Sequence, residues 1–552
     1  MTVIIINVCE SNLRSSFLCK SLYLYQTKSI NPLKMKTIIK PKISRESLLI
    51  LIFTLFTFAF HLLTALNYGL HRDEYLYLAF SKHPDWGYFS VPPLIGVFSK
   101  LIYLLFNGSV LGVRFFPALT GALTVMIIGL ITKRLGGKAF AITVASLAYI
   151  LSPSYLRVNT LFQPVTFEQF LWILAVYVIF RLIIDGNPKL WLWFGLVMGI
   201  AILNKYLVGL YAACLLLSML LLTQRKYLFT RYFLIAAGIG LIIIFPNLVW
   251  QYNHNFPIFT HLAELNKYQL QNVKVSEFLF MQLGMHLPGV IVWITGLIGV
   301  LFYSRMRDLR AIGLTFIFGM IALILFKGKG YYTLGLFLPL FAIGGERLEA
   351  YWRSRKTLRY GLVVLMFLLA LPMVPYSIPV LSYPQLEKYA GSTGKYFGNL
   401  PLIWEDGKVH PIPQDFADMT GWNEVGRMAV QSYLKLDENT KKHCGLYGDN
   451  YGQAGAIMYA SRGMNLPEPL CFSDNFMFWA PDSLTFNSVI YIDDNIDDEK
   501  KLFHHIDTIG TIRNKYFREN GVSVLFMSEP TDSLRKVYDR KIVEIRKVYF
   551  RK

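Results

Sequence analysis

Seven ionisable side chains crowd into residues 67–93, directly after an apolar run that is too long for an ordinary core helix. They are His71, Arg72, Asp73, Glu74, Lys82, His83 and Asp85. A carboxylate at such a boundary is partly desolvated, which raises its pKa towards the range that is useful for proton transfer. We therefore expect acid–base chemistry here, with Asp73 as the first candidate for a catalytic base and Glu74 as the second.

The spacing of the two acids limits what they can share. Neighbouring residues on a helix point about 100° apart, so Asp73 and Glu74 cannot face one pocket equally. One of them is expected to orient a partner. The alternative is that both merely cap a surface helix, because acids are favoured in the first turn.

A KGKGYY turn at 327–332 carries cations that could hold an anion. Lys327 and Lys329 are flanked by glycines, which let the backbone approach the bound group. Tyr331 and Tyr332 follow, and a phenol there either donates a hydrogen bond to a phosphate or lies at a membrane interface. The alternative for this turn is a short solvated connection between helices.

Two further cations lie at the ends of apolar runs. Arg114 opens one run, and it either reaches the same anion or extends to lipid headgroups. Lys205 lies between two short runs, where an intramembrane lysine costs about 2.5–3.5 kcal/mol and so needs a partner or a water-filled cavity. The alternative for Lys205 is a short external loop.

A membrane-embedded helical bundle must position these residues. Residues 47–66 hold a single histidine and are otherwise free of titratable groups, and such a run spans a hydrocarbon core of roughly 30 Å. Hydrophobic residues make up 54% of the chain and charged residues 16%, which excludes a purely water-soluble fold. We predict a polytopic α-helical membrane protein with about eleven to thirteen transmembrane helices. The apolar runs lie near 47–66, 111–132, 139–156, 165–184, 190–204, 206–223, 232–250, 286–303, 311–326, 332–346 and 359–380.

The net charge of +20 fits a membrane topology better than nucleic-acid binding. Lysines and arginines cluster before the first run and in every second short loop, which the positive-inside rule assigns to the cytoplasm. The amino terminus is then cytoplasmic, while the loop at 67–110 and everything after Tyr383 face the periplasm or the exterior. We expect membrane lipids as neighbours and no nucleic acid as a partner.

These patterns divide the chain into three parts. We expect a cytoplasmic segment at 1–46, a transmembrane domain at 47–383 and a soluble α/β domain at 384–552. Met35 precedes basic residues and a long apolar helix, so residues 1–34 either belong to a mis-assigned start or form a cytoplasmic extension.

Finer patterns predict several short elements. Helical spacing indicates juxtamembrane helices at 73–80 and 92–106 and another helix at 423–435. Short strand-like runs indicate strands at 488–493 and 522–527. In the terminal domain, we expect Asp415, Asp418 and Trp422 either to contact a saccharide or to begin a capped helix. Cys444 and Cys471 either form a disulfide or stay as free thiols.

Several longer segments between about residues 45 and 490 together resemble one known family, although no single segment would identify it. They are YFSVPP (88–93), RFFPALTGALTVMIIGLITKRLGG (114–137), LNKY (203–206), PNLVWQYNHNFP (246–257), KGKGYYTLGLFLP (327–339), DFADMTGW (415–422) and DNYGQAGAIMYA (449–460). Together with an acid pair after the first helix, this set resembles the family 39 glycosyltransferases. These are polyprenyl-phosphate-sugar-dependent membrane enzymes that include lipid A aminoarabinose transferases and protein O-mannosyltransferases.

The resemblance implies a GT-C fold with the active site on the outer face of the bundle. It also implies a second acid after the third span, for which Glu168 and Gln163 are both candidates. Transfer from a polyprenyl-phosphate sugar needs an acceptor hydroxyl that loses its proton and cations that stabilise the departing phosphate. We expect an inverting glycosyltransferase with a lipid A, glycan or protein acceptor, in the inner membrane of a bacterium.

Other functions are weighed against this one. A secondary transporter or a flippase of lipid-linked sugars is the main alternative, but it would place ionisable groups near the bilayer midplane and often shows two related halves. A non-catalytic scaffold is a third. We expect no metal site, because His254, His261 and His286 lack the i, i+4 spacing of a helical site, although a divalent cation as cofactor stays open.

Overall fold

The computed structural model describes residues 43–64, 66–268, 274–493 and 499–551. The described residues from Arg45 onward belong to one compact unit. The predictions about the start of the chain therefore fall almost entirely outside the described residues.

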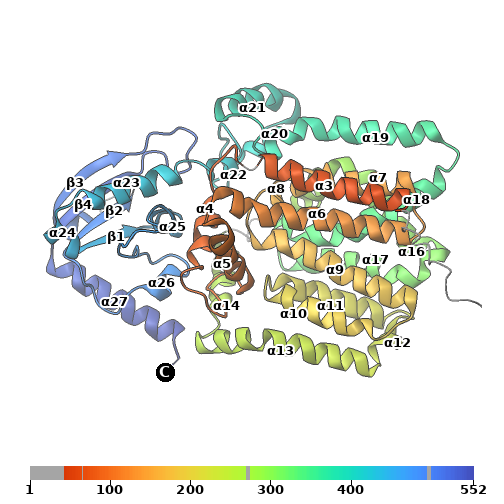
Figure 1. Ribbon diagram of the computed structural model, residues 1–552, viewed down its shortest axis with the longest axis horizontal. Coiled ribbons are helices and arrows are strands. Elements are labelled where there is room, and N and C mark those ends of the chain that lie inside the picture. The colour runs from red at the N-terminus through yellow and green to blue at the C-terminus, as the bar shows by residue number, and fades with distance from the viewer. Residues whose placement is uncertain (1–42, 65, 269–273, 494–498, 552) are drawn as a thin grey trace, which may run out of the picture. The chain divides into compact units, whose positions relative to one another are not determined.

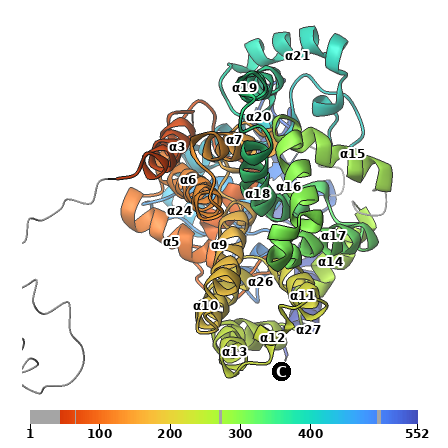
Figure 2. The same cartoon turned by 90° about the vertical axis from the view of Figure 1, so that its right-hand side faces the viewer.

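Apolar helices make up the first part of the compact unit and occupy each of the predicted runs. Figure 1 shows the longer ones, from α3 in red to α19 in green, with nearly parallel axes, and Figure 2 looks along the bundle. The bounds are α3 Arg45–Thr64, α6 Val110–Arg134, α7 Ala139–Ile150, α9 Pro164–Asp185, α10 Leu190–Ile202, α11 Leu207–Leu220, α13 Arg231–Asn253, α16 Val290–Phe302, α17 Arg310–Leu325, α18 Leu334–Tyr351 and α19 Lys356–Ala370.

Fewer of these helices have the length of a membrane span than we predicted. Within the described ranges, six helices are long and apolar enough to cross a bilayer, or seven if the bent pair Val275–Met285 and Leu287–Phe302 is one span. The prediction of about eleven to thirteen spans is too high by this measure. Short helices such as α7 and α11 were counted because a helix buried inside a bundle is as apolar as one that faces lipid.

Short helices connect the long ones. They are α8 Pro153–Val158, α12 Arg225–Leu228, α14 Pro257–Tyr268, α15 Val275–Met285, α20 Val374–Ser377 and the 3₁₀ turns η2 Leu287–Gly289, η3 Ser304–Leu309, η4 Gly330–Thr333 and η5 Leu371–Met373.

The helix that follows the KGKGYY turn, α18, packs closely inside the bundle. A Cβ atom on Gly344 of α18 would collide with the backbone oxygen of Val292 on α16, so these helices meet at their backbones. Small residues are the usual means of tight packing in a membrane, where lipid supplies no hydrophobic drive. Because α18 is buried from Leu334 to Leu348, it holds the end of the turn that precedes it in place.

Two short helices follow α3, as the spacing predicted. They are α4 Arg72–Ala79 and α5 Leu94–Phe106. A capping box starts α4: the backbone N–H of Asp73 donates to His71 Nδ1, and the backbone N–H of His71 donates to the Glu74 carboxylate. This cap places both acids in the first turn of the helix.

A four-stranded sheet forms the core of the carboxy-terminal part, with the order β1-β2-β4-β3. β1 (Cys444–Gly448) runs parallel to β2 (Ser488–Asp493), while β4 (Ser523–Pro530) is antiparallel to both β2 and β3 (Phe503–Thr511). Leu446 pairs with Ile490, and Ile490 pairs with Phe526. β2, β4 and α23 (Trp422–Leu434) confirm the two predicted strands and the predicted helix.

Helices flank this sheet and connect it to the bundle (Figure 1). They are α21 Tyr383–Phe397, α22 Gln414–Ala417, α24 Glu438–Lys442, α25 Tyr451–Ala460, α26 Phe476–Trp479, α27 Asp532–Tyr549 and the 3₁₀ turns η6 Leu400–Leu402 and η7 Glu499–Lys501. Cys444 and Cys471 are both buried free thiols.

Small residues bring α25 against α4. A Cβ atom on Gly455 would lie 2.8 Å from the backbone of Tyr75, and one on Gly452 would lie 2.9 Å from the Arg72 side chain. Figure 1 shows the two helices next to each other. The small residues of the DNYGQAGAIMYA segment thus let α25 pack closely against α4, and this packing places Tyr451 next to Asp73.

Candidate active site

Asp73 is held by residues from two distant parts of the chain. The Tyr451 hydroxyl at the start of α25 donates a hydrogen bond to Asp73 Oδ1 at 2.9 Å. Gln163, which precedes α9, donates from Nε2 to Oδ2 at 3.0 Å. The Asp73 side chain is 29% exposed, so one side of the carboxylate remains open to a reactant. This geometry suits a base that is oriented before its substrate arrives.

The electrostatics of Asp73 differ from what we predicted. Burial by itself raises the pKa of this carboxyl, but interactions with His71 and Arg72 oppose that effect. The hydrogen bond from Tyr451 and the charge of Lys329 add to them, and the net pKa lies below its ordinary value. The predicted upward shift is wrong because it counted desolvation and omitted the cations. Asp73 is an ionised carboxylate at neutral pH.

Glu74 is committed to the fold rather than open to a reactant. Its carboxylate forms an ion pair with Arg114 and accepts hydrogen bonds from the backbone N–H groups of His71 and Phe162, each at 2.7 Å. Arg114 also donates to the backbone oxygen of Gly69 at 2.9 Å. The two side chains are 0% and 1% exposed. In this structure Arg114 therefore contacts Glu74 instead of presenting its charge to a phosphate.

Lys205 has the partner that its position required. Its Nζ lies 2.7 Å from Glu168 Oε2, and the two side chains are 20% and 3% exposed. The same ammonium group lies 4.7 Å from the ring centre of Tyr332 and 5.5 Å from that of Tyr331. The fold thus brings together candidate residues from three separate segments, and Glu168 is the ion-pair partner of Lys205.

The KGKGYY turn presents its two lysines differently. Lys329 is half-buried and its charge acts on Asp73, whereas Lys327 is exposed and has a left-handed backbone with φ of 52°. Gln282 of α15 fixes the turn, because Thr333 donates to its Oε1 at 2.5 Å and its Nε2 donates to the Gly330 oxygen at 3.4 Å. Lys329 is therefore the better placed of the two predicted phosphate ligands.

Sequence reasoning did not single out Tyr451 or Asp474. Burial raises the pKa of Asp474 to about 6, a hydrogen bond from Ser90 opposes this, and the nearby charge of Asp73 adds to it. The DNYGQAGAIMYA segment was the available signal for Tyr451, since its small residues mark a packing face. We find no comparable signal for Asp474.

The other predicted polar residues serve the fold. Trp422 is buried, and its indole N–H donates to the backbone oxygen of Asp418 at 3.0 Å. Asp418 forms an ion pair with Arg518 at 3.2 Å, and Asp415 forms one with Arg157. Among the residues that the structure describes, no group of three or more His, Cys, Asp or Glu side chains could hold a metal ion.

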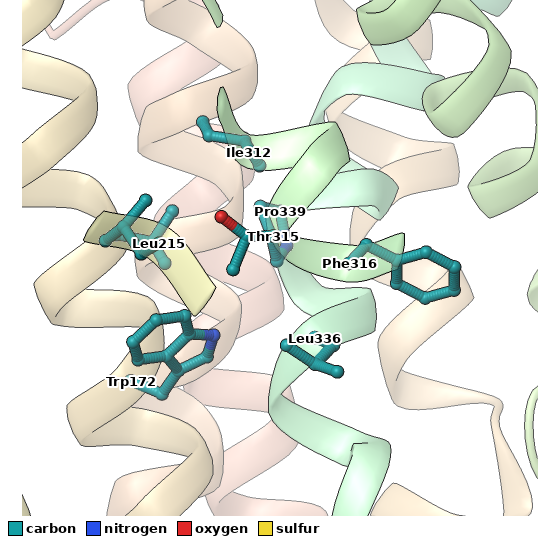
Figure 3. A pocket seen from close by; sticks show the side chains of 8 residues that line it. Trp172, Leu215, Ile312, Thr315, Phe316, Leu336 and Pro339 are labelled. Atoms are coloured by element: carbon teal, nitrogen blue, oxygen red, sulfur yellow. The ribbon is translucent and has the colours of Figure 1, made fainter. Parts of the chain in front are cut away.

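A small apolar cavity inside the bundle lies apart from this cluster (Figure 3). Its volume is about 10 Å³, and its lining includes Trp172 of α9, Leu215 of α11, Thr315 of α17 and Leu336 of α18. Such a space holds about one water molecule, so it cannot admit a sugar.

Comparison with known sequences gives two matches. Residues 90–250 match the family model described as dolichyl-phosphate-mannose-protein mannosyltransferase. The lipid A galacturonosyltransferase RgtD of Rhizobium johnstonii is 24% identical over 194 residues, which cover 35% of this chain and 41% of that protein. The chain thus matches less than half the length of this relative.

Solved structures extend the likeness over most of the chain. ArnT from Cupriavidus metallidurans, bound to undecaprenyl phosphate, matches with a TM-score of 0.57 and 15% identity, covering 86% of this chain and 97% of ArnT. Its apo state matches with a TM-score of 0.57 and 14% identity, covering 88% and 98%. The chain therefore has the fold of ArnT, a polytopic helical membrane bundle followed by a small α/β domain.

Proposed function

We propose that this protein is an inverting glycosyltransferase that takes a sugar from a polyprenyl-phosphate donor. The acceptor is a hydroxyl group of lipid A, or of another glycan or protein of the envelope, on the outer face of the inner membrane. The observation that carries the proposal is an ionised carboxylate, Asp73, oriented by Tyr451 and Gln163 within electrostatic range of Lys329. The names of the relatives support it, since one acts on lipid A and another was solved with undecaprenyl phosphate.

Asp73 is the base in this mechanism. The acceptor oxygen forms a bond to the anomeric carbon while the bond from that carbon to the donor phosphate oxygen breaks. The hydroxyl proton passes to Asp73, and the phosphate leaves with the bonding electron pair. Because a lowered pKa makes Asp73 a weak base, it orients the hydroxyl and takes its proton only as the new bond forms.

Lys329 stabilises the charge that develops on the leaving phosphate, and Lys327 contributes from the exposed side of the same turn. Tyr331 and Tyr332 lie beside Lys205, so their hydroxyl groups are available to the phosphate or to the sugar. Glu168 balances the charge of Lys205 and holds its ammonium group in place rather than acting as a second catalytic acid.

Glu74 and Arg114 position the site without touching substrate. Their buried ion pair ties α4 to α6, and the bond from Phe162 ties both to the segment before α9. Asp73 and Gln163 stand on these same elements, so the pair sets the distance between them. The distribution of lysines and arginines supports a cytoplasmic amino terminus and a periplasmic carboxy-terminal domain.

Mass spectrometry of envelope lipids and glycoproteins from a deletion strain tests the proposal. A sugar modification that is lost in the deletion strain should return with the wild-type gene and not with the Asp73→Asn variant. Asp85→Asn is the matched control, because Asp85 is an exposed acid on the same segment. Equal restoration by wild type and Asp73→Asn would remove Asp73 as the base.

A further inference from the structure

A second cavity, of about 420 Å³, lies in the α/β domain. Its lining includes Lys441, Lys442, Glu468, Trp479, Pro481 and Thr485. The volume falls within the range of about 300–1,000 Å³ that small-molecule sites occupy. None of these residues belongs to the cluster around Asp73, so the cavity is separate from that cluster.

Aromatic and charged groups line this cavity together. The Trp479 ring stacks against His83 with 4.2 Å between ring centres, and His83 in turn lies 2.8 Å from Glu468. An indole held in place by a neighbouring ring offers a rigid apolar surface to a sugar ring. Glu468 adds carboxylate oxygens that can accept hydrogen bonds from sugar hydroxyls.

The two lysines of the cavity differ in their availability. Lys441 Nζ lies 2.8 Å from Glu438. Lys442 is exposed, and among the described residues no carboxylate lies within ion-pair distance of it. An uncompensated ammonium group beside a polar cavity favours a ligand that carries an anionic group.

One short segment joins the cavity to the neighbourhood of the active site. Asp474, whose pKa responds to the charge of Asp73, stands just before α26, and Trp479 ends that helix at the cavity wall. Asn475 fixes the segment to the bundle, because its Oδ1 accepts a hydrogen bond from the backbone N–H of Phe89 at 2.9 Å. A ligand in the cavity would therefore lie on the same framework that borders the reacting groups.

We propose that this cavity binds a sugar unit of the acceptor, one that carries a phosphate or carboxylate group contacted by Lys442. The role as an acceptor subsite rests on the proposed transferase function, whereas saccharide binding itself does not.

Calorimetric titration of the purified full-length protein in detergent micelles tests binding. The probes are trehalose 6-phosphate, trehalose and inorganic phosphate, which separate the sugar from the anion. Trehalose 6-phosphate should bind with a Kd of about 1 mM, and trehalose and phosphate should each bind at least about fivefold more weakly, since each makes only part of the contacts. Equal binding of phosphate and trehalose 6-phosphate would overturn the saccharide assignment.

Two variants at exposed positions locate the binding. Lys442→Ala should weaken trehalose 6-phosphate about five- to tenfold, and Thr485→Trp should abolish binding by filling the cavity. Lys435→Ala, at an exposed lysine that does not line the cavity, is the matched control and should bind like wild type. Wild-type affinity in both cavity variants, or no binding to wild type, would overturn the site.

The acceptor role has its own readout. Thr485→Trp should raise the KM for the acceptor at least about fivefold with the KM for the donor unchanged, and an unchanged acceptor KM would overturn that role. Asp73→Asn should bind trehalose 6-phosphate like wild type. Sugar transfer that persists in Asp73→Asn would contradict the proposed mechanism and leave the binding result intact.

Discussion

Replacing Tyr451 with phenylalanine tests how the α/β domain acts on the base. The change removes one hydroxyl group, which donates to Asp73 Oδ1 at 2.9 Å. The phenyl ring still fits beneath the Arg72 guanidinium, which lies 4.4 Å from the ring centre. Gln163 still donates to Oδ2, so the carboxylate keeps one of its two anchors.

The sign and size of the effect follow from the hydrogen bond. The bond favours the ionised carboxylate, so its loss raises the pKa of Asp73. A hydrogen bond to a charged group is worth about 1.5–3 kcal/mol, and one pKa unit corresponds to about 1.4 kcal/mol. Because the side chain is 29% exposed, water replaces part of the lost bond, and we expect an upward shift of about one unit.

The pH profile of kcat/KM measures this shift. The low pKa of wild-type Asp73 keeps the base ionised across the neutral and mildly acidic range, and activity should fall only at lower pH. In Tyr451→Phe the acid limb should begin about one pH unit higher. Tyr459→Phe is the control, since it removes a hydroxyl on the same helix that donates to the Gly108 oxygen at 3.0 Å. An unchanged acid limb in a folded Tyr451→Phe protein, or an equal shift in the control, would refute the reasoning.

Three further predictions test ionisable side chains in and around the candidate site. Glu74→Gln should lower the free energy of unfolding by about 3–5 kcal/mol, because Arg114 then stays buried without its partner; a variant that is as stable as wild type but inactive would contradict the positioning role. Glu168→Ala should lower the free energy of unfolding by about 2–3 kcal/mol, because it leaves Lys205 without its partner. The double variant Glu168→Ala/Lys205→Ala should lose less stability than the sum of the two single variants. Strictly additive losses in denaturant unfolding would mean that the pair is not coupled. Asp474 has its pKa raised to about 6, so folding favours its protonated form and the wild type loses stability as the pH rises from about 4 to 6. Asp474→Asn should remove that loss from Tm measured against pH, and an identical pH dependence in both proteins would argue against it.

Local patterns in the sequence were sufficient for much of the fold. Long apolar runs marked the bundle helices, and short apolar runs marked β2 and β4, because each pattern reflects burial within its own segment. By length, six or seven spans qualify among the described residues, fewer than the eleven to thirteen predicted, since composition alone does not separate a full-length span from a shorter apolar helix. The length of a helix and the helices packed around it decide whether it crosses the membrane.

The site was harder to predict because its contacts join distant segments. The need for a partner of Lys205 followed from the cost of a charge in lipid, and the structure supplies Glu168. Tyr451 lies 378 positions from Asp73 in the sequence, and no local pattern connects them. The wrong pKa direction for Asp73 has two sources, because the adjacent cations His71 and Arg72 were left out of the prediction and Tyr451 and Lys329 come from distant segments.

The most direct test of Asp73 as the base is sugar transfer by purified protein. The assay follows release of undecaprenyl phosphate from an undecaprenyl-phosphate sugar in the presence of a lipid A acceptor. Asp85→Asn, which alters an exposed acid, should match wild type. Asp73→Asn should lower kcat by about 10²–10⁴-fold, the usual contribution of a general base, while the protein folds and binds donor normally. A kcat for Asp73→Asn within about twofold of wild type would contradict the assignment of Asp73.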